Sequence, residues 1–250
     1  MIILNNRTDL AIEEYNENIK YPVDRIINGM RLRKCIINKE DSKRLNKKEG
    51  VYYSIEDLDY YNKDRIIIKI ISSIICDFIS KMKNINNILV VGLGNPSITP
   101  DSLGPLVLEQ IEVNRHLEKE KKYSLSAITP GVMGQTGMES CDIIKAIVND
   151  FSPDLVIVID SLACNNLKRI CSSIQFGESI NPGSGIYNNR KELSKETLGC
   201  EVIAIGIPTV VDLSTIIDID SSFFVTPNHI DQAMDILSGI IAEGINKAFV

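Results

Sequence analysis

The sequence has no hydrophobic run that approaches the ~20 residues needed to cross a bilayer. Its longest apolar stretches are residues 65–79, which polar and charged residues interrupt, and residues 154–160, which are too short. The first residues also lack a basic stretch followed by an apolar one, so they predict no secretory signal. We therefore expect a cytoplasmic protein without a membrane partner.

Paired metal-binding or redox cysteines are absent as well. None of the six cysteines forms a CxxC pair, which argues against a zinc cage or a disulfide-exchange motif. Scattered cysteines in a chain without a signal are usually reduced and behave as small buried hydrophobic residues.

The charge is unevenly distributed. The formal net charge is −6, yet residues 20–50 contain ten Lys and Arg against four Asp and Glu. A basic segment can meet nucleic acid or an acidic protein, but this one lacks interleaved aromatic residues and any known nucleic-acid module. We expect a solvated face or arm and no direct nucleic-acid contact. Residues 1–50, polar and weakly periodic, predict an N-terminal arm beside a single α/β domain over residues 51–250.

The rest of the chain alternates between strand and helix patterns. Short, β-branched runs predict strands buried on both faces at 87–94, 153–163 and 200–209. Helical spacing of apolar residues covers 56–83, 101–118, 137–151 and the C-terminal end, with Thr226 as the predicted N-cap and Pro227 as the first helical residue. This order predicts a twisted, mainly parallel central sheet flanked by helices, in a phosphorylase/hydrolase-like three-layer arrangement.

The stretch GLGNPSITPDSLGP, residues 92–105, begins like a nucleotide-binding loop. Gly92 and Gly94 fit the dinucleotide pattern, but Ser97 stands where the third glycine is needed. A Walker loop fails too, because no Gly-Lys-Ser/Thr follows. Nucleotide binding is therefore disfavoured, and the loop instead offers Asp101.

Two aspartates follow predicted strands. Asp101 lies in the loop after one strand, and Asp160 is the last residue of another. Ligand crevices of open parallel sheets lie at the carboxyl ends of strands, and neighbouring strands are ~4.8 Å apart. Two carboxyl groups there could share one water, with one ionised as a base and the other protonated as an acid. The alternative for Asp101 is a simple helix N-cap.

Several segments together resemble the germination protease family of spore-forming bacteria. The resemblance lies in VVGLGNPSITPDSLGP, VNRHL, TPGVMGQTGMES, DLVIVIDSLA, NPGSGIYNNRKELSKETLGCEVIAIGIPTVVD and VTPNHIDQ, in that order. It implies an atypical aspartic endopeptidase, distantly similar to hydrogenase maturation proteases, whose essential aspartates fall on Asp101 and Asp160. It also implies small acid-soluble spore proteins as substrate, a homotetramer and action in the forespore or spore core. No cofactor and no metal are expected.

Further roles follow from the resemblance. Residues 7–13, RTDLAIE, resemble the point where the family's zymogen is cut, which predicts cleavage between Asp9 and Leu10 and a propeptide of about residues 1–9.

Substrate or oxyanion contacts are expected from a set of glycines and basic residues. The glycines are equally explained by turns, and the basic residues by a solvated segment. The residues of this set are Gly131, Gly134, Gly137, Gly183, Arg190 and Lys191. Asp212 is a third carboxylate near a strand end, where we expect a cap.

Three alternatives remain open at this point. A hydrogenase-maturation-type protease would need nickel and a histidine beside the two aspartates. A non-catalytic binding protein on the same fold would use the basic residues 20–50. A peptidyl-tRNA hydrolase, which GLGNP locally resembles, would depend on His116.

Overall fold

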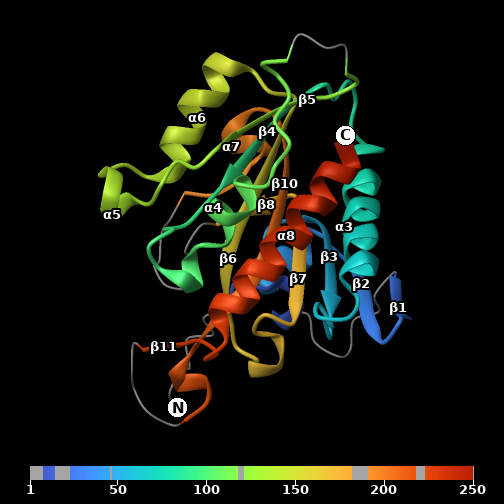
Figure 1. The fold of residues 1–250 in the computed structure, drawn as a ribbon, viewed down its shortest axis with the longest axis vertical. Helices are drawn as coiled ribbons and strands as arrows, with labels where there is room; N and C mark the ends of the chain where they lie inside the picture. Colours follow the sequence, from blue (N-terminus) through green and yellow to red (C-terminus); the bar gives the residue numbers. More distant parts are fainter. Residues whose placement is uncertain are drawn as a thin grey trace.

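Four parallel strands form the centre of the computed structural model, which describes residues 8–14, 23–45, 47–117, 121–181, 191–217 and 223–249. In spatial order they are β10 (Glu201–Asp212), β6 (Leu155–Cys164), β4 (Asn87–Gly92) and β5 (Ser124–Ile128) (Figure 1). The first five residues of β6 are all fully buried, which explains their continuous apolar sequence. The predicted α/β class, with a mainly parallel central sheet flanked by helices, is confirmed.

Antiparallel strands extend the sheet beyond β10. They are β7 (Ser173–Gly177), β3 (Gly50–Glu56), β2 (Met30–Ile37) and β1 (Val23–Ile27), in that order. The expectation of an arm is therefore wrong for residues 23–45, and the boundary at residue 50 falls at the start of a strand.

Two features of the sequence explain this error. In β2 the buried residues Met30, Leu32, Cys35 and Ile37 are interleaved with basic ones, so the charge hides the alternation of a strand. The turn between β1 and β2 is Asn28–Gly29, with φ of 51° and 85°. Asn-Gly between two such runs is a strong hairpin signal, because both positions need positive φ.

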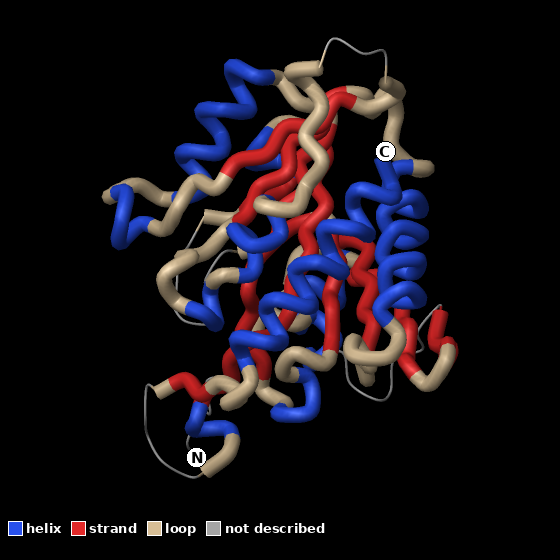
Figure 2. Tube along the Cα trace, in the orientation of Figure 1, coloured by secondary structure: helices blue, strands red, loops and turns tan. Residues whose placement is uncertain are grey.

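Helices cover both faces of the sheet (Figures 1 and 2). On one face, α3 (Asp64–Ile79) and α8 (Ile230–Phe249) pack side by side and also enclose α4 (Leu103–Leu108) in the larger core cluster. On the other, α6 (Ser140–Phe151) and α7 (Lys195–Leu198) cover the smaller one. The three predicted layers are thus present.

Shorter elements complete the described part of the chain. The helices are α1 (Ala11–Glu14), α2 (Lys39–Leu45) and α5 (Met133–Thr136), with 3₁₀ turns η1 (Thr99–Asp101), η2 (Leu167–Arg169) and η3 (Leu213–Thr215). The strands are β8 (Ser179–Ile180) and β9 (Leu193–Ser194), which pair with each other, and β11 (Phe224–Val225), which pairs with β10.

Two predicted helices begin or end elsewhere. The helix expected over 101–118 ends at Leu108, because Asn114 turns the chain back by pairing its side chain and backbone with Leu125 of β5. The C-terminal helix begins at Ile230 and not at Pro227. Thr226 does not cap it, since its hydroxyl donates to the carbonyl of Thr209.

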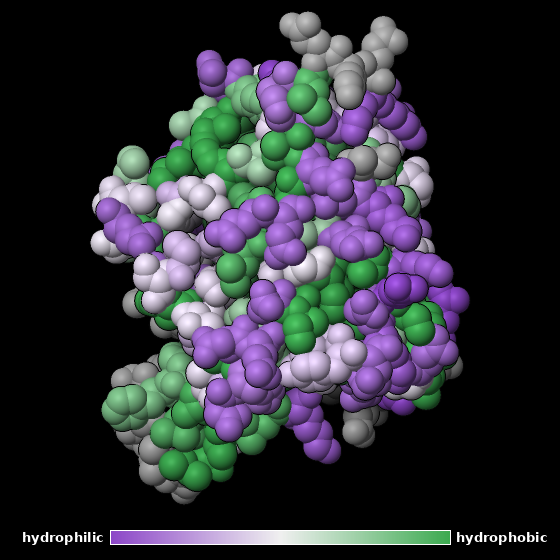
Figure 3. Space-filling model, viewed as in Figure 1, coloured by the Kyte–Doolittle hydropathy of each residue, from purple (hydrophilic) through white to green (hydrophobic). Residues whose placement is uncertain are grey.

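Apolar residues gather on one part of the surface. Figure 3 shows them at the lower left, where Figure 1 places β11. Ile216, Ile217 and Phe223 are exposed there, the last by 68%. In the parts of the chain described, no helix is long and apolar enough to cross a membrane.

Candidate active site

Strand β6 extends beyond the end of its neighbour β4, and Asp160 lies just past the point where the pairing of the two strands ends. The last register pair is Gly92 with Ile159, and β6 then continues to Cys164. Asp160 is the first residue past this pair and is only 5% exposed. The carboxyl edge of the parallel strands therefore buries an acidic side chain, as the sequence predicts.

The segment from Gly92 to Asp101 folds back closely on itself and ends at the carboxylate of Asp101. Gly94 has a φ of +114°, and a Cβ there would lie 1.9 Å from the carbonyl oxygen of Asp101. The same crowding holds at Gly92, where a Cβ would lie 2.5 Å from the carbonyl oxygen of Gly104. These glycines allow close backbone contacts within the chain, which accounts for them without a phosphate.

The two candidate catalytic carboxyl groups interact electrostatically. Burial raises the pKa of Asp101 to about 6, against the hydrogen bond that Asn95 N donates to its Oδ2 at 2.9 Å. Burial, then the charge of Asp101, then that of Asp9, raise the pKa of Asp160 well above its usual range. Ser161 N donates to Asp160 Oδ1 at 2.9 Å, so each carboxyl group has one oxygen held by a backbone amide. This arrangement can keep one carboxyl protonated beside an ionised partner.

The N-terminal segment is the third part of the site. Asp9 N donates to the carbonyl of Ala163 at 3.0 Å, and Ala163 N donates to Asp9 Oδ2 at 2.8 Å. Leu10 is 1% exposed and packs against the end of β6 and β10. The predicted cleavage point thus lies against the strand that carries Asp160.

The glycine loop contacts the Asp101 loop through a side chain. Gln135 Nε2 donates to Asn95 Oδ1 at 3.0 Å. Gly131 and Gly137 have φ of +75° and +73°, and Gly137 ends α5, so both serve turns. Gly134 has no atom within 4 Å of an added Cβ, so neither crowding nor its backbone conformation explains a glycine there.

The remaining predicted residues fall in three places. Lys191 forms an ion pair with Asp142 of α6 at 2.7 Å, while Gly183 and Arg190 lie outside the described residues. Asp212 Oδ1 accepts hydrogen bonds from Ser214 N and Oγ at 2.9 and 2.7 Å, as expected of a cap.

Both histidines are exposed. His229 is exposed ahead of α8 next to Asn228. His116 is exposed and follows Arg115, whose backbone N–H donates to the carbonyl of Leu125 near the start of β5. This is the amino-terminal edge of the parallel strands, whereas Asp160 lies at the carboxyl edge. Among the described residues, no group of three or more His, Cys, Asp or Glu is arranged to hold a metal ion.

One residue at this edge was missed from the sequence. The register between β10 and β6 shifts between Pro208 and Val210, so Thr209 is the extra residue of a β-bulge. Its side chain is 1% exposed, and its hydroxyl has no hydrogen-bond partner among the described residues. Pro208 is the available signal, because proline inside a central strand indicates a bulge.

An α/β sheet with two coupled carboxyl groups at its carboxyl edge, one buried and one partly buried, has the acid–base groups of a hydrolase. The comparisons with known proteins specify this class. The profile of the Peptidase A25 family, described as germination protease, matches residues 4–222. This chain belongs to the germination protease family, a family of peptidases.

Individual relatives agree with this assignment. The chain is 37% identical to the germination protease of Clostridium acetobutylicum, over 97% of this chain and 94% of that protein. It is 40% identical to that of Bacillus subtilis over 84% of this chain, but it spans only 64% of that protein's length. A [NiFe] hydrogenase maturation protease, HycI from Thermococcus kodakarensis, is 20% identical with a TM-score of 0.38, over 65% of this chain and 94% of that one.

Proposed function

We propose that this protein is an aspartic endopeptidase that begins the degradation of small acid-soluble spore proteins during germination, in the spore core. Membership of the family supports the peptidase activity and the biological setting. The observation that carries the catalytic part is the coupling of Asp101 in η1, after β4, and Asp160 in β6, two carboxyl groups whose pKa values are both raised.

The pKa shifts support one division of roles between the two aspartates. With a pKa of about 6, Asp101 is mostly ionised at neutral pH and takes a proton from the attacking water. Asp160 is more deeply buried, and its raised pKa favours the protonated form, which donates its proton to the carbonyl oxygen as Asp101 deprotonates the water. When the tetrahedral diol collapses, Asp101 passes the proton from water to the leaving amine, and Asp160 regains a proton from a diol hydroxyl. The amides of Asn95 and Ser161 fix the orientation of the two groups.

Amide substitutions test this mechanism. Asp101→Asn and Asp160→Asn keep the size and the hydrogen-bond acceptor of each side chain but remove the titratable group. We expect each to lower the rate of spore-protein cleavage by about 10²–10⁴-fold, the usual contribution of a positioned acid or base. The assay follows release of peptides from a purified small acid-soluble spore protein.

Asp212→Asn is the matched control, because Asp212 is a buried aspartate like Asp160 and its carboxylate caps η3. Its activity should stay within a few-fold of the wild type. Full activity in either Asp101→Asn or Asp160→Asn would contradict the mechanism, whereas absence of cleavage by the wild type would favour a non-catalytic binding protein. Nickel-dependent activity would favour the maturation-type alternative instead.

We further propose that the chain is a zymogen that cleaves itself between Asp9 and Leu10. The support is the position of that bond. Asp9 forms two hydrogen bonds with the backbone of Ala163, which lies only three residues after Asp160. Intact-mass measurement of the purified protein over time should show loss of residues 1–9. Asp160→Asn should stay intact, and processing of this variant at the wild-type rate would contradict self-cleavage.

We also propose that the glycine loop and Lys191 contact the substrate. Gly131 and Gly134 offer backbone amides in a segment tied to the Asp101 loop, whereas the amide of Gly137 donates to the carbonyl of Met133 and would have to leave it first. Lys191 would have to leave Asp142 before it could bind an acidic substrate. Alanine scanning of kcat/KM at these positions tests both roles.

A homotetramer is the proposed assembly. The exposed apolar residues Ile216, Ile217 and Phe223 support a self-association surface, because apolar groups gathered on a surface often mark a protein contact. Light scattering after gel filtration measures the mass directly, and a monomer at working concentration would contradict the assembly.

A further inference from the structure

Strand β5 is the last strand at one end of the sheet, and its outer side is open. Ser124 N donates to the carbonyl of Asn86 at 2.8 Å, so the backbone groups of Ser124 are directed toward β4 and the preceding loop. Successive residues of a strand direct their N–H and C=O groups to opposite sides. The backbone groups of Leu125 and Ala127 are therefore directed away from the sheet.

Asn114 takes the place of a partner strand for one of these two residues. Leu125 N donates to Asn114 Oδ1 at 2.9 Å, and the carbonyl of Leu125 accepts from Asn114 N at 3.1 Å. Two residues further along β5, the outward N–H and C=O of Ala127 have no hydrogen-bond partner within the described ranges. A free sheet edge of this kind binds an extended peptide through main-chain hydrogen bonds.

A pocket of about 390 Å³ lies beside the free edge. Residues of β5 and of the segment after α4 line it: Leu125, Ser126, Ala127, Val113, Arg115 and His116. Val113 is exposed by 39%, which gives the pocket an apolar part. The pocket thus combines a free strand edge with an apolar surface and basic side chains.

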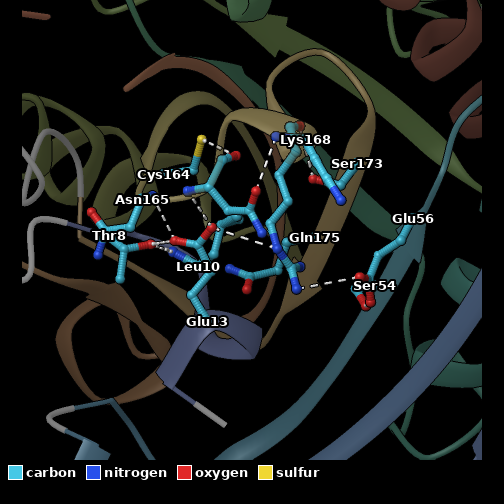
Figure 4. Close-up of polar contacts among 12 residues, drawn as sticks. Thr8, Leu10, Glu13, Ser54, Glu56, Cys164, Asn165, Lys168, Ser173 and Gln175 are labelled. Atoms are coloured by element: carbon cyan, nitrogen blue, oxygen red, sulfur yellow. Dashed lines mark hydrogen bonds and ion pairs between the residues drawn. The ribbon is translucent and has the colours of Figure 1, made fainter. Parts of the chain in front are cut away.

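The guanidinium of Arg115 is held in place but not neutralised. It lies 3.9 Å from the centroid of the Phe151 ring in α6, which is a cation–π contact. Arg169, by contrast, lies 3.5 Å from Glu13 and 3.3 Å from Glu56, two carboxylates drawn in Figure 4. In the part of the chain that the structure describes, Arg115 forms no ion pair. Its N–H donors are therefore available to a negatively charged ligand.

This pocket is separate from the candidate active site. Val90 of β4 pairs with Ala127 on one side and with Ile157 of β6 on the other. Ala127 is therefore level with Ile157, which lies three residues before Asp160, and β4 lies between the free edge and β6. A ligand on β5 leaves the carboxyl edge of β6 open.

We propose that this pocket binds the C-terminal end of an extended peptide. The peptide runs antiparallel to β5, exchanges main-chain hydrogen bonds with Ala127, and places its terminal carboxylate at Arg115, beside His116. Its last side chain is apolar and packs against Val113. A guanidinium suits this ligand, because its planar N–H groups bind both oxygens of a carboxylate.

The source of such peptides is the reaction itself. Hydrolysis of a peptide bond creates a new C-terminal carboxylate at each cut, so the ligands are the products of cleavage. This part rests on the proposed peptidase function, whereas the binding site is tested without catalysis.

The test uses the full chain with Asp160→Asn, which prevents cleavage of the probe. Fluorescein-labelled Gly-Ser-Thr-Ser-Val with a free C-terminal carboxylate is compared with the same peptide ending in an amide, and anisotropy measures each Kd. We expect the carboxylate form to bind about tenfold more tightly, because only its terminus is charged. Equal affinity, or no binding of either peptide, would overturn the site.

Arg115→Gln, added to the same background, should abolish the preference for the carboxylate form. Lys121→Gln is the matched control, because it removes an exposed positive charge just ahead of β5 but does not line the pocket. It should preserve the preference. A preference that survives Arg115→Gln would overturn the assignment of the carboxylate to this pocket.

Ala127→Pro tests the strand edge. It removes the outward N–H, and proline is tolerated on an edge strand where that group faces away from the sheet. We expect both peptides to bind about tenfold more weakly, whereas Ala127→Ser, which keeps the N–H, should bind as the parent does. Unchanged binding in Ala127→Pro would overturn the edge contact. Circular dichroism checks folding, and the comparison of the two peptides remains decisive if a variant does not fold.

Light scattering separates the peptide from a second copy of the chain as the occupant of the edge. Self-association that Ala127→Pro abolishes, without a carboxylate preference, would assign the edge to a contact between chains and overturn the peptide site. Cleavage of a spore protein by the wild type reports on the proposed function alone. Carboxylate preference without cleavage would support the pocket and contradict the peptidase, and cleavage without preference would do the reverse.

Discussion

Asp9 binds Ala163 through both of the latter's backbone groups: it donates its amide to the carbonyl at 3.0 Å and accepts the Ala163 amide at Oδ2 at 2.8 Å. This contact holds a negative charge near Asp160, where it contributes to the raised pKa of that carboxyl group. Cleavage after Asp9 would remove this charge together with the propeptide. Processing is thereby linked to the protonation of the proposed acid.

Asp9→Asn in the unprocessed chain should therefore lower the pKa of Asp160. The amide keeps the shape and an oxygen that can accept the Ala163 hydrogen bond, but it removes a like charge that disfavours ionisation. Carboxyl ¹³C chemical shifts of Asp160, followed against pH, measure the change. Asp212→Asn serves as a control of the same type, and an unchanged or higher Asp160 pKa in Asp9→Asn would contradict the coupling.

Stability should depend on pH through Asp101. The unfolded carboxyl releases its proton near pH 3.8 and the folded one near 6, so the folded state binds more protons between these values. The free energy of unfolding of the wild type therefore falls as pH rises through this window. Asp101→Asn cannot titrate, so its stability relative to wild type should increase from pH 4 to pH 7 by on the order of 2 kcal/mol.

Urea unfolding of both proteins at pH 4, 5 and 7 measures this difference. Asp160 contributes with the same sign, because its pKa is also raised. A difference between Asp101→Asn and wild type that stays constant with pH would show that Asp101 has an ordinary pKa in the folded protein.

The turn at Gly94 should not tolerate a side chain. Gly94→Ala places a Cβ 1.9 Å from the Asp101 carbonyl at a φ of +114°, so the loop must move. We expect a loss of about 2–4 kcal/mol in the free energy of unfolding, together with loss of cleavage activity. Gly134→Ala is the control for stability alone, because its Cβ would meet no atom within 4 Å. Wild-type activity in Gly94→Ala would contradict the role of this turn.

The parallel centre of the fold could be predicted because its strands are buried on both faces. Residues 155–159 have no polar member, so their pattern has one interpretation in an α/β sequence. The antiparallel strands could not be found in the same way. In β2 arginine and lysine residues lie between the buried residues, so the basic composition of the segment conceals the alternating pattern of a strand. The dipeptide Asn28–Gly29 is the one local signal of the β1–β2 hairpin among these residues.

The two aspartates of the candidate site could be placed from the sequence because each lies next to a recognisable strand or loop. Asp160 comes directly after the apolar residues 155–159 of β6, and Asp101 ends the glycine-containing loop that follows β4. The contacts of Glu13 with Asn165, Asn166 and Arg169 could not be foreseen, because they join segments about 150 residues apart. Only the folded sheet brings the N-terminal segment to the end of β6.

Thr209 gives a final prediction, because its buried hydroxyl has no hydrogen-bond partner among the described residues. Burying a hydroxyl without a partner costs free energy, so the isosteric Thr209→Val should raise the free energy of unfolding by about 1 kcal/mol. The hydroxyl lies in the bulge of β10 beside the end of β6. If it serves the substrate, the same variant should lose activity while it gains stability.

Thr197→Val is the matched control for this change. Thr197 completes a capping box at α7 with Ser194, so its loss should destabilise the protein by about 1 kcal/mol. Urea unfolding and spore-protein cleavage are measured on both variants. Lower stability in Thr209→Val would show that the hydroxyl is satisfied in the folded protein, and unchanged activity would exclude it from the substrate's contacts.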